Sequence, residues 1–145
     1  MKKIMITIAM MLALLTTAFA GEENVKAEIL TAFKEKFSTA QEVSWNAGKM
    51  YAEATFLFNG NWMTAHYNDR AELIGVSRNI TSSQLPYYLQ NNLKKNYSGY
   101  WITDLFELSN STGFSHYVTL KNADEEIVLE SLNGKNWKVY HSTKI

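Results

Sequence analysis

Hydrophobic and polar positions alternate most regularly between Lys49 and Tyr67, in the segment KMYAEATFLFNGNWMTAHY. A period of two is typical of β-strands. Asn59-Gly60, in the middle of this segment, is the strongest short-range hairpin signal, because both residues tolerate the positive φ angles of a type I′ turn. A two-residue turn fixes the register of the strands. The pairs on one face are then mostly apolar: Phe58 with Asn61, Phe56 with Met63, Ala54 with Ala65 and Ala52 with Tyr67.

The other face of the predicted hairpin is mixed. The same register pairs Leu57 with Trp62, Thr55 with Thr64, Glu53 with His66 and Tyr51 with Asn68. Antiparallel sheets commonly pack one face on the core and leave the other in water. We therefore expect the apolar face to cover a helix, and the mixed face is the best candidate for a working surface.

Two other segments repeat apolar residues every four positions, as amphipathic helices do. The first runs from about Asn24 to Ser38-Thr39, and its apolar stripe consists of Val25, Ile29, Phe33 and Phe37. The second begins near Ser83 and ends at Ser98-Gly99, with Pro86 in the first turn, where a missing N–H costs little. Its stripe consists of Leu85, Leu89, Leu93 and Tyr97. Asn24 and Ser83 are the expected N-caps.

The two helices are part of an internal repeat. Their stripes match at a constant offset of 60 residues, and strands follow each helix. The offset grows to 66 where Tyr51 matches Tyr117, because the second copy has a longer first turn at 109–113. The sequence thus predicts an α+β fold of two tandem copies, about 24–80 and 83–141, each a helix followed by antiparallel strands. The expected strands are 42–46, the two arms of the hairpin, 72–79, 101–108, 114–121, 126–132 and 136–141.

Residues 1–20 have the pattern of a cleaved secretory signal peptide. Lys2 and Lys3 form a basic region, an apolar run extends to Leu15, and Ala18-Phe19-Ala20 forms a cleavage site before Gly21. The run is short for a membrane anchor and has no stop-transfer flank. The chain contains no cysteine, so a lipid-modified N-terminal cysteine is excluded. We expect residues 21–145 to form a single exported domain without a membrane span.

Charge and cysteine content narrow the class of partner. Without residues 1–20, 12 basic residues (14 less Lys2 and Lys3) face 14 acidic ones. No basic stripe is present for a phosphate backbone, so nucleic acid is not an expected partner. A cysteine-free exported protein is held together by packing, which fits a bacterial periplasm or cell surface.

Catalytic chemistry has little support in the sequence. The three histidines, His66, His116 and His141, lack the spacing of a zinc site, and the register places His66 and His116 on opposite faces. The Glu53–His66 pair could act as an acid/base dyad, although an exposed pair of this kind is usually a weak electrostatic contact. Only Thr55 and Thr64 offer nearby hydroxyls, and no oxyanion-hole or phosphate-loop motif is present. We therefore expect no enzymatic activity, metal or cofactor.

Aromatic side chains are more informative. The register places Tyr51, Trp62 and Tyr117 on the solvated faces, and Trp137 is a weaker candidate there. In the second half, a loop at 122–125 pairs Tyr117 with Glu130, Thr119 with Val128 and Lys121 with Glu126. Amphipathic aromatics in polar surroundings are typical of protein–protein hot spots. The candidate binding face consists of Tyr51, Glu53, Thr55, Trp62, Thr64, His66, Tyr117, Thr119 and Glu130.

Two questions about these faces stay open at the level of sequence. The sheets of the two halves could instead cover one another and bury the same rings as ordinary core. In the last strand, the register set by Asn133-Gly134 places Lys138 on the core side, which indicates a β-bulge.

A series of short motifs resembles the PepSY-like family, which consists of small exported proteins common in Bacteroidetes, with a fold like that of the β-lactamase inhibitor protein. The motifs are Phe33…Phe37, Val43-Ser44-Trp45, Tyr51-x-Ala-x-x-Phe56, Tyr67-Asn-Asp, Leu85-Pro86 and Tyr97-x-Gly99-Tyr100. One departure is Ala71, where the family usually has glycine. The resemblance implies a fold, a periplasmic or surface location, and a binding or inhibitory role toward an envelope protein, with no catalytic residues. The alternative is a binder of a small ligand or glycan that uses the same aromatics as a platform.

Overall fold

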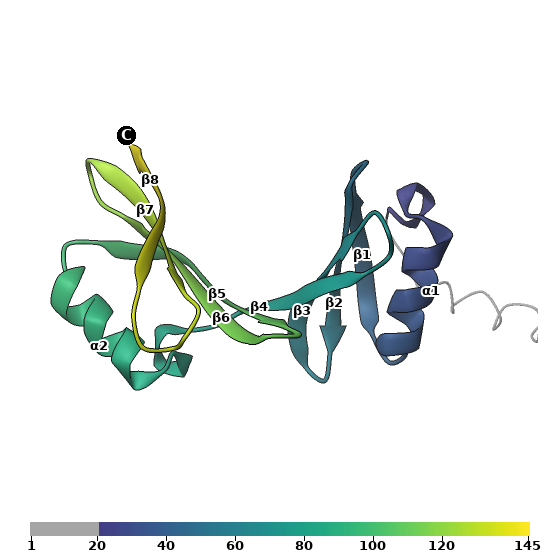
Figure 1. The fold of residues 1–145 in the computed structure, drawn as a ribbon, viewed down its shortest axis with the longest axis horizontal. Coiled ribbons are helices and arrows are strands. Elements are labelled where there is room, and N and C mark those ends of the chain that lie inside the picture. Colours follow the sequence, from purple (N-terminus) through teal and green to yellow (C-terminus); the bar gives the residue numbers. More distant parts are fainter. Residues whose placement is uncertain (1–20) are drawn as a thin grey trace, which may run out of the picture.

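The structure is a computed structural model that describes residues 21–145, so the predicted signal peptide lies outside the described residues. Eight strands form one antiparallel sheet in chain order, and two α-helices pack against it (Figure 1). The helices are α1 (Ala27–Lys36) and α2 (Tyr87–Asn96), each preceded by a 3₁₀ turn, η1 (Glu22–Asn24) and η2 (Ser82–Gln84). The strands are β1 (Gln41–Ala47), β2 (Tyr51–Phe58), β3 (Asn61–Asn68), β4 (Leu73–Asn79), β5 (Trp101–Asn110), β6 (Gly113–Lys121), β7 (Glu125–Ser131) and β8 (Lys138–Lys144).

The central hairpin has the predicted register along its whole length. Tyr51 pairs with Asn68 at one end and Phe58 with Asn61 at the other. Asn59 and Gly60 have φ angles of 49° and 78°, as a type I′ turn requires. The apolar face is buried as expected: Ala54, Phe56 and Ala65 have no measurable exposure.

Both helices begin later than predicted. The N-cap of α1 is Lys26 and that of α2 is Pro86, so Asn24 and Ser83 are not the helix caps. Leu85 lies before a proline and is extended, with ψ 150°, because a proline disfavours helical backbone at the preceding residue. Ser83 instead belongs to η2, whose N-terminus is closed by a capping box between Thr81 and Gln84.

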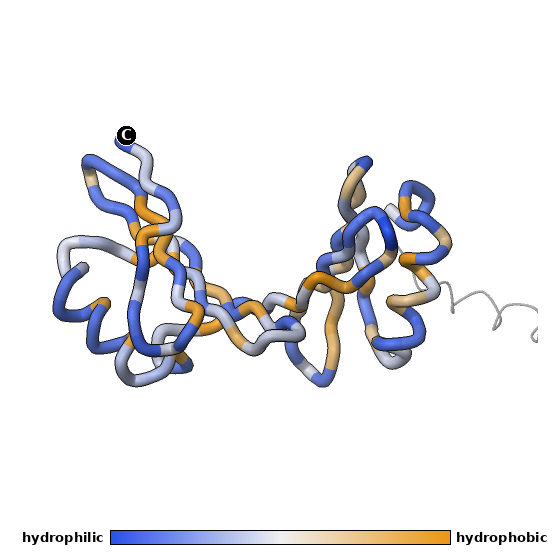
Figure 2. Tube along the Cα trace, in the orientation of Figure 1, coloured by the Kyte–Doolittle hydropathy of each residue, from blue (hydrophilic) through white to orange (hydrophobic). Residues whose placement is uncertain are grey.

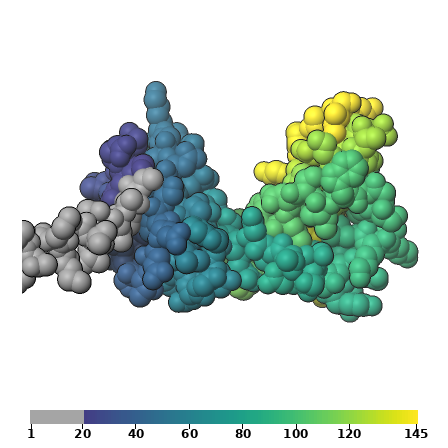
Figure 3. Space-filling model, turned by 180° about the vertical axis from the view of Figure 1, so that it is seen from behind, coloured from purple at the N-terminus to yellow at the C-terminus, as the bar shows by residue number. Residues whose placement is uncertain are grey.

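The two halves share one continuous sheet. β4 pairs with β5 through four residue pairs, from Val76–Ser109 to Asn79–Phe106. Both helices lie on the outer side of the curved sheet, and the space-filling view shows two lobes joined by a narrower waist (Figures 1 and 3). The alternative in which two sheets cover each other is therefore wrong. Tyr51 and Trp62 are 46% and 53% exposed on the opposite side.

Each helix covers its own apolar core. The core under α1 is aromatic: the ring of Phe33 contacts those of Phe37, Trp45 and Phe56, and Phe37 also contacts Phe56. The core under α2 is mostly aliphatic and includes Leu89, Leu93, Leu105, Val118, Leu120 and Leu129. The apolar stretches run through the strands, whereas α2 itself is largely hydrophilic (Figure 2).

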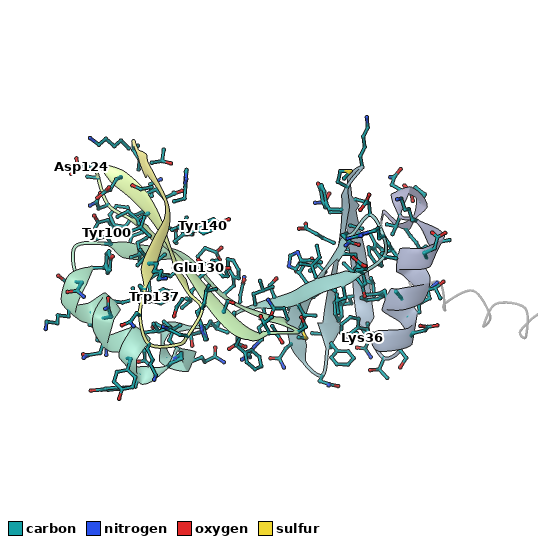
Figure 4. The ribbon with its side chains drawn as sticks, viewed as in Figure 1. Lys36, Tyr100, Asp124, Glu130, Trp137 and Tyr140 are labelled. Atoms are coloured by element: carbon teal, nitrogen blue, oxygen red, sulfur yellow. The ribbon has the colours of Figure 1, made fainter. Side chains whose placement is uncertain are left out.

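The last strand differs most from the prediction. The register shifts between Val128 and Leu129, so the expected bulge is present, but Lys138 pairs with Glu130 instead of facing the core. Trp137 lies outside the strand and its indole Nε1 donates a hydrogen bond to the Leu89 carbonyl oxygen, 3.1 Å away. Trp137 therefore packs on the side of α2, not on the solvated face where it was predicted (Figure 4).

Some features of the first half recur in the second. α1 and α2 both have ten residues, and a register shift in β1 between Gln41 and Ser44 recurs in β5 between Ile102 and Asp104. Helices and first strands thus match at an offset of 60 residues. Trp45 pairs with Ala54, and Leu105 pairs with Val118, so the second strands match at 64. The predicted offset of 66 is wrong, because Tyr117 takes the position of Glu53 rather than that of Tyr51.

Candidate functional site on the concave face of the sheet

The sheet face that carries no helix is concave and contains a cleft of about 460 Å³. Side chains of seven strands, β2 to β8, line this cleft, so it extends across both halves of the molecule. Aromatic residues dominate its wall, together with one acidic residue and one histidine: Tyr51, Phe106, Tyr117, Tyr140, Glu53 and His66. Figure 4 shows Tyr140 and Glu130 on the side of the sheet that faces the space between the lobes.

The nine predicted site residues lie on this face, but they form two groups. Six come from β2 and β3 in the first half, and three from β6 and β7 in the second. Hydrogen bonds order both groups: the hydroxyls of Thr55 and Thr64 lie 3.1 Å apart, and Tyr117 donates to a Glu130 carboxylate oxygen at 2.7 Å. The cleft brings together four of the nine, Tyr51, Glu53, His66 and Tyr117, whereas the other five lie outside its lining.

Glu53, His66 and Ser77 form a hydrogen-bonded chain. His66 Nδ1 lies 3.2 Å from Glu53 Oε1, as the register predicted, and His66 Nε2 lies 2.8 Å from Ser77 Oγ. This is the connectivity of a serine–histidine–acid triad. However, β4 pairs with β3 on one side and β5 on the other, so the backbone N–H groups around Ser77 are used in the sheet and none is free to form an oxyanion hole. These hydrogen bonds fix the side chains of Glu53, His66 and Ser77 in place on the concave face.

Tyr117 lies at the centre of an aromatic cluster in the second half. Phe106 stacks on its ring with centroids 5.0 Å apart, and Tyr140 contacts it edge-on at 6.0 Å. Burial, reinforced by the hydrogen bond to Glu130, raises the pKa of the Tyr117 phenol to about 12. The phenol therefore stays a neutral donor at physiological pH.

Sequence reasoning missed three residues of this face: Ser77, Phe106 and Tyr140. Phe106 alternates with buried Leu105, and this alternation is the signal that could have placed it opposite Tyr117. Tyr140 lies on the concave face because Lys138 pairs with Glu130, one residue away from the register that Asn133-Gly134 predicts. Ser77 contacts His66 because β3 and β4 pair in the sheet, and the register of these two strands was not predicted from the sequence.

A second polar cluster lies on the helix side of the sheet, at the waist. Arg78 Nε donates to Glu107 Oε1 at 3.0 Å, and His116 Nε2 lies 3.3 Å from Glu107 Oε2. His116 is buried, on the face where the register placed it. Among residues 21–145, no three His, Asp or Glu side chains lie close enough together to hold a metal ion. None of the helices in the same range is long and apolar enough to cross a membrane.

No protein-family model matches the sequence, and no curated protein matches it significantly. Solved structures do match the fold. A DUF2874 family protein from Bacteroides uniformis superimposes with a TM-score of 0.70 at 18% identity, over 83% of this chain and 89% of the other. A BLIP-like protein from Bacteroides fragilis gives a TM-score of 0.67 at 16% identity, over 83% and 86% of the two chains.

A third match is a protein from Bacteroides eggerthii that is described as a proposed periplasmic protein. Its TM-score is 0.69 at 16% identity, over 83% of this chain and 89% of the other. Identities this low establish a shared fold and nothing more. The chain has the α+β fold of these Bacteroides proteins, with one antiparallel sheet and two helices. The resemblance to the PepSY-like family stays a prediction.

Proposed function

We propose that this chain is an exported, non-catalytic binding module that captures a cell-envelope protein on the concave face of its sheet. One observation carries the proposal: a cleft open to solvent, lined by aromatic side chains from both halves of the sheet. Tyr51, Trp62 and Tyr140 on this face are 46%, 53% and 66% exposed. Large exposed aromatics on a concave surface are the residues that most often dominate protein–protein affinity.

The internal order of the face supports the same function. Hydrogen bonds already fix Thr55, Thr64, His66 and Tyr117, so these side chains lose little conformational freedom on binding. A strand-borne site of this kind is stiff, and a projecting loop of a partner would fit between the two lobes.

The proposal includes the location of the protein, an inhibitory role and the origin of its two halves. A signal peptide at 1–20 would deliver the protein to the periplasm or cell surface, and the proposed location of the Bacteroides eggerthii protein agrees with this. Likeness to a BLIP-like protein is compatible with an inhibitory role. We also infer that the chain is a tandem duplication of a PepSY-like unit, because the helices, first strands and register shifts correspond at an offset of 60 residues.

The second candidate function is the binding of a small ligand or glycan by the same cleft. The cleft volume of about 460 Å³ favours this alternative, because small-molecule sites have volumes in this range. Both functions use the same aromatic residues, so mutation of the face alone does not separate them. Binding of purified glycans, measured alongside binding of envelope proteins, does.

The test combines a pull-down from periplasmic extract with a thermal melt. Trp62→Ala should lose about 2 kcal/mol or more of binding free energy, the usual cost of truncating a hot-spot residue. The fold should stay intact, because the Trp62 ring is 53% exposed. Tyr87→Ala is the matched control, since this exposed aromatic lies on α2, away from the concave face. A stable Trp62→Ala protein that retains its partner, together with a Tyr140→Ala protein that does so, would exclude this face.

A further inference from the structure

The spaces beneath the two helices are filled differently, although the helices meet the sheet in the same way. Helix positions correspond at an offset of 60 residues and second-strand positions at 64. Phe33 therefore corresponds to Leu93, and Phe56 corresponds to Leu120. The second half thus has leucines at two positions where the first half has phenylalanines.

The phenylalanines fill the space under α1. Phe56 has no measurable exposure, and its ring lies 4.9 Å from that of Phe33 and 4.8 Å from that of Phe37, between centroids. Under α2, a hollow of about 370 Å³ borders on Leu93 and Leu120. We call it the α2 hollow. A hollow of similar volume, about 380 Å³, adjoins the end of α1, but Phe33 and Phe56 do not line it. Space at the positions of Leu93 and Leu120 is therefore a feature of the second half, where smaller side chains replace the two rings.

The α2 hollow has an apolar wall and a polar rim. Ile102, on the strand next to Leu120, is 42% exposed, although it lies on the helix side of the sheet. The polar side chains around the opening are Ser82, Ser83, Gln90, Lys94 and Ser98. Gln90 already donates to the carbonyl oxygens of Ser83 and Leu85. These two hydrogen bonds hold the Gln90 side chain in place at the rim of the hollow.

Lys94 supplies the positive charge at this rim. Its side chain lies in the last turn of α2 and forms no ion pair with any residue in the range 21–145. No acidic residue lines the α2 hollow among the described residues, and the hydroxyl of Tyr100, which does line it, donates a hydrogen bond to Glu125. An apolar wall beside an unpaired ammonium group is complementary to a molecule with an apolar body and an anionic head.

We propose that the α2 hollow binds a small amphiphilic carboxylate, with its apolar body against Ile102, Tyr97 and the edge of Leu93 and its carboxylate beside Lys94. The volume of about 370 Å³ suits a medium-chain fatty acid or an arylalkanoic acid. This site lies on the opposite side of the sheet from the concave cleft, and it does not depend on the function proposed for that cleft.

The test is a titration of the purified exported protein with sodium octanoate, followed by ¹H–¹⁵N NMR. Octanoate should shift the amide signals of Leu93, Ser98 and Ile102, at the lining of the hollow. Shifts confined to the concave face, around Tyr51 and Tyr140, would overturn the proposal, as would the absence of saturable shifts. Trp62→Ala should bind octanoate as tightly as the unchanged protein does.

Three variants sharpen the test. Leu93→Phe restores the larger residue of the first half and should weaken octanoate at least about tenfold, because the added ring occupies the hollow. Ile102→Ser removes the exposed apolar wall and should also weaken binding, which keeps the test decisive if Leu93→Phe fails to fold.

Lys94→Gln should lower the affinity for octanoate about three- to fivefold and leave the affinity for octanol unchanged, because only the anion contacts the ammonium group. Unchanged octanoate affinity in folded Leu93→Phe or Ile102→Ser would overturn the proposal.

Discussion

The ring of Phe33 on α1 meets the ring of Phe56 on β2 edge to face, with centroids 4.9 Å apart and an interplanar angle of 84°. This is a favoured geometry for aromatic pairs, because the positive edge of one ring faces the negative face of the other. Phe33 is 3% exposed and Phe56 is not exposed at all. The pair joins the first helix to the central hairpin and forms the centre of the first core.

Truncation of this pair should therefore be costly. We expect Phe33→Ala or Phe56→Ala to lower the free energy of unfolding by about 3–5 kcal/mol, as is usual for a buried phenylalanine. Denaturant unfolding measures this change. Leu93→Ala is a useful comparison and should cost less, about 2–3 kcal/mol, because Leu93 already borders on a hollow. A loss below about 1 kcal/mol for either phenylalanine would contradict the packing described here.

The parts of the fold that follow from local rules could be predicted from the sequence. Asn59-Gly60 fixes the register of β2 and β3, and the loop at 122–125 fixes that of β6 and β7, and both registers are confirmed. The joining of both halves into one sheet could not be predicted, because it depends on β4–β5 pairing across the intervening helix α2. The register of β8 already differs by one residue from the prediction at Lys138–Glu130, because a loop at 132–137 joins β7 and β8 instead of a two-residue turn at Asn133-Gly134.

The same distinction explains the site. The predicted pairs Glu53–His66 and Tyr117–Glu130 are hydrogen-bonded, since each follows from the register of one hairpin. The cleft itself arises only when β3, β4 and β5 become neighbours, and Ser77 and Phe106 join the face for this reason. The exposure of the aromatic face depends equally on that long-range pairing.

Removal of the Tyr67 hydroxyl should stabilise the protein. The side chain is 1% exposed, and its Oη has no hydrogen-bond partner among residues 21–145. A buried hydroxyl without a partner costs free energy because it loses its hydration. We expect Tyr67→Phe to raise the free energy of unfolding by about 1 kcal/mol, measured by urea titration at pH 7. A destabilised variant would indicate that the hydroxyl is satisfied in solution.

The same residue should affect alkaline stability. Burial raises the pKa of Tyr67 to about 12, above the ordinary value of 10.0. Between these values the unfolded chain loses the phenolic proton while the folded protein retains it, so unfolding becomes more favourable as pH rises. The stabilisation is complete below pH 10 and decreases between about pH 10 and pH 12. Tyr67→Phe should reduce this dependence, whereas an unchanged slope would show that other groups, including Tyr117, account for it.

Ala71 occupies a backbone conformation that favours glycine. Its φ angle is 62°, in the turn between β3 and β4, where the PepSY-like family usually has glycine. A left-handed conformation costs an alanine about 1–2 kcal/mol. We expect Ala71→Gly to stabilise the protein by about 1 kcal/mol in thermal or chemical unfolding. Gly60→Ala is the matched opposite change: its φ angle is 78° and no atom crowds the position, so it should destabilise the protein through backbone strain alone.

The Glu53–His66–Ser77 chain should not catalyse ester hydrolysis. No backbone donor is free to stabilise an oxyanion, and such a donor usually contributes about 10²–10³-fold to rate. We expect the hydrolysis of p-nitrophenyl acetate by the protein to be equal before and after Ser77→Ala. A rate that depends on Ser77, with a burst of p-nitrophenol, would reverse the assignment of this face as non-catalytic.

The Arg78–Glu107 ion pair should couple the two halves of the sheet. The two residues face each other across the β4–β5 junction, with Arg78 Nε 3.0 Å from Glu107 Oε1, and their side chains are 35% and 17% exposed. Partial exposure screens the pair, so we expect Glu107→Gln to cost only about 1–2 kcal/mol of stability. A double-mutant cycle with Arg78→Met should give a coupling energy of about 1 kcal/mol that decreases at high salt. A coupling energy of zero would mean that the backbone pairs of β4 and β5 alone hold the lobes together, and the waist would then be stable without its charged side chains.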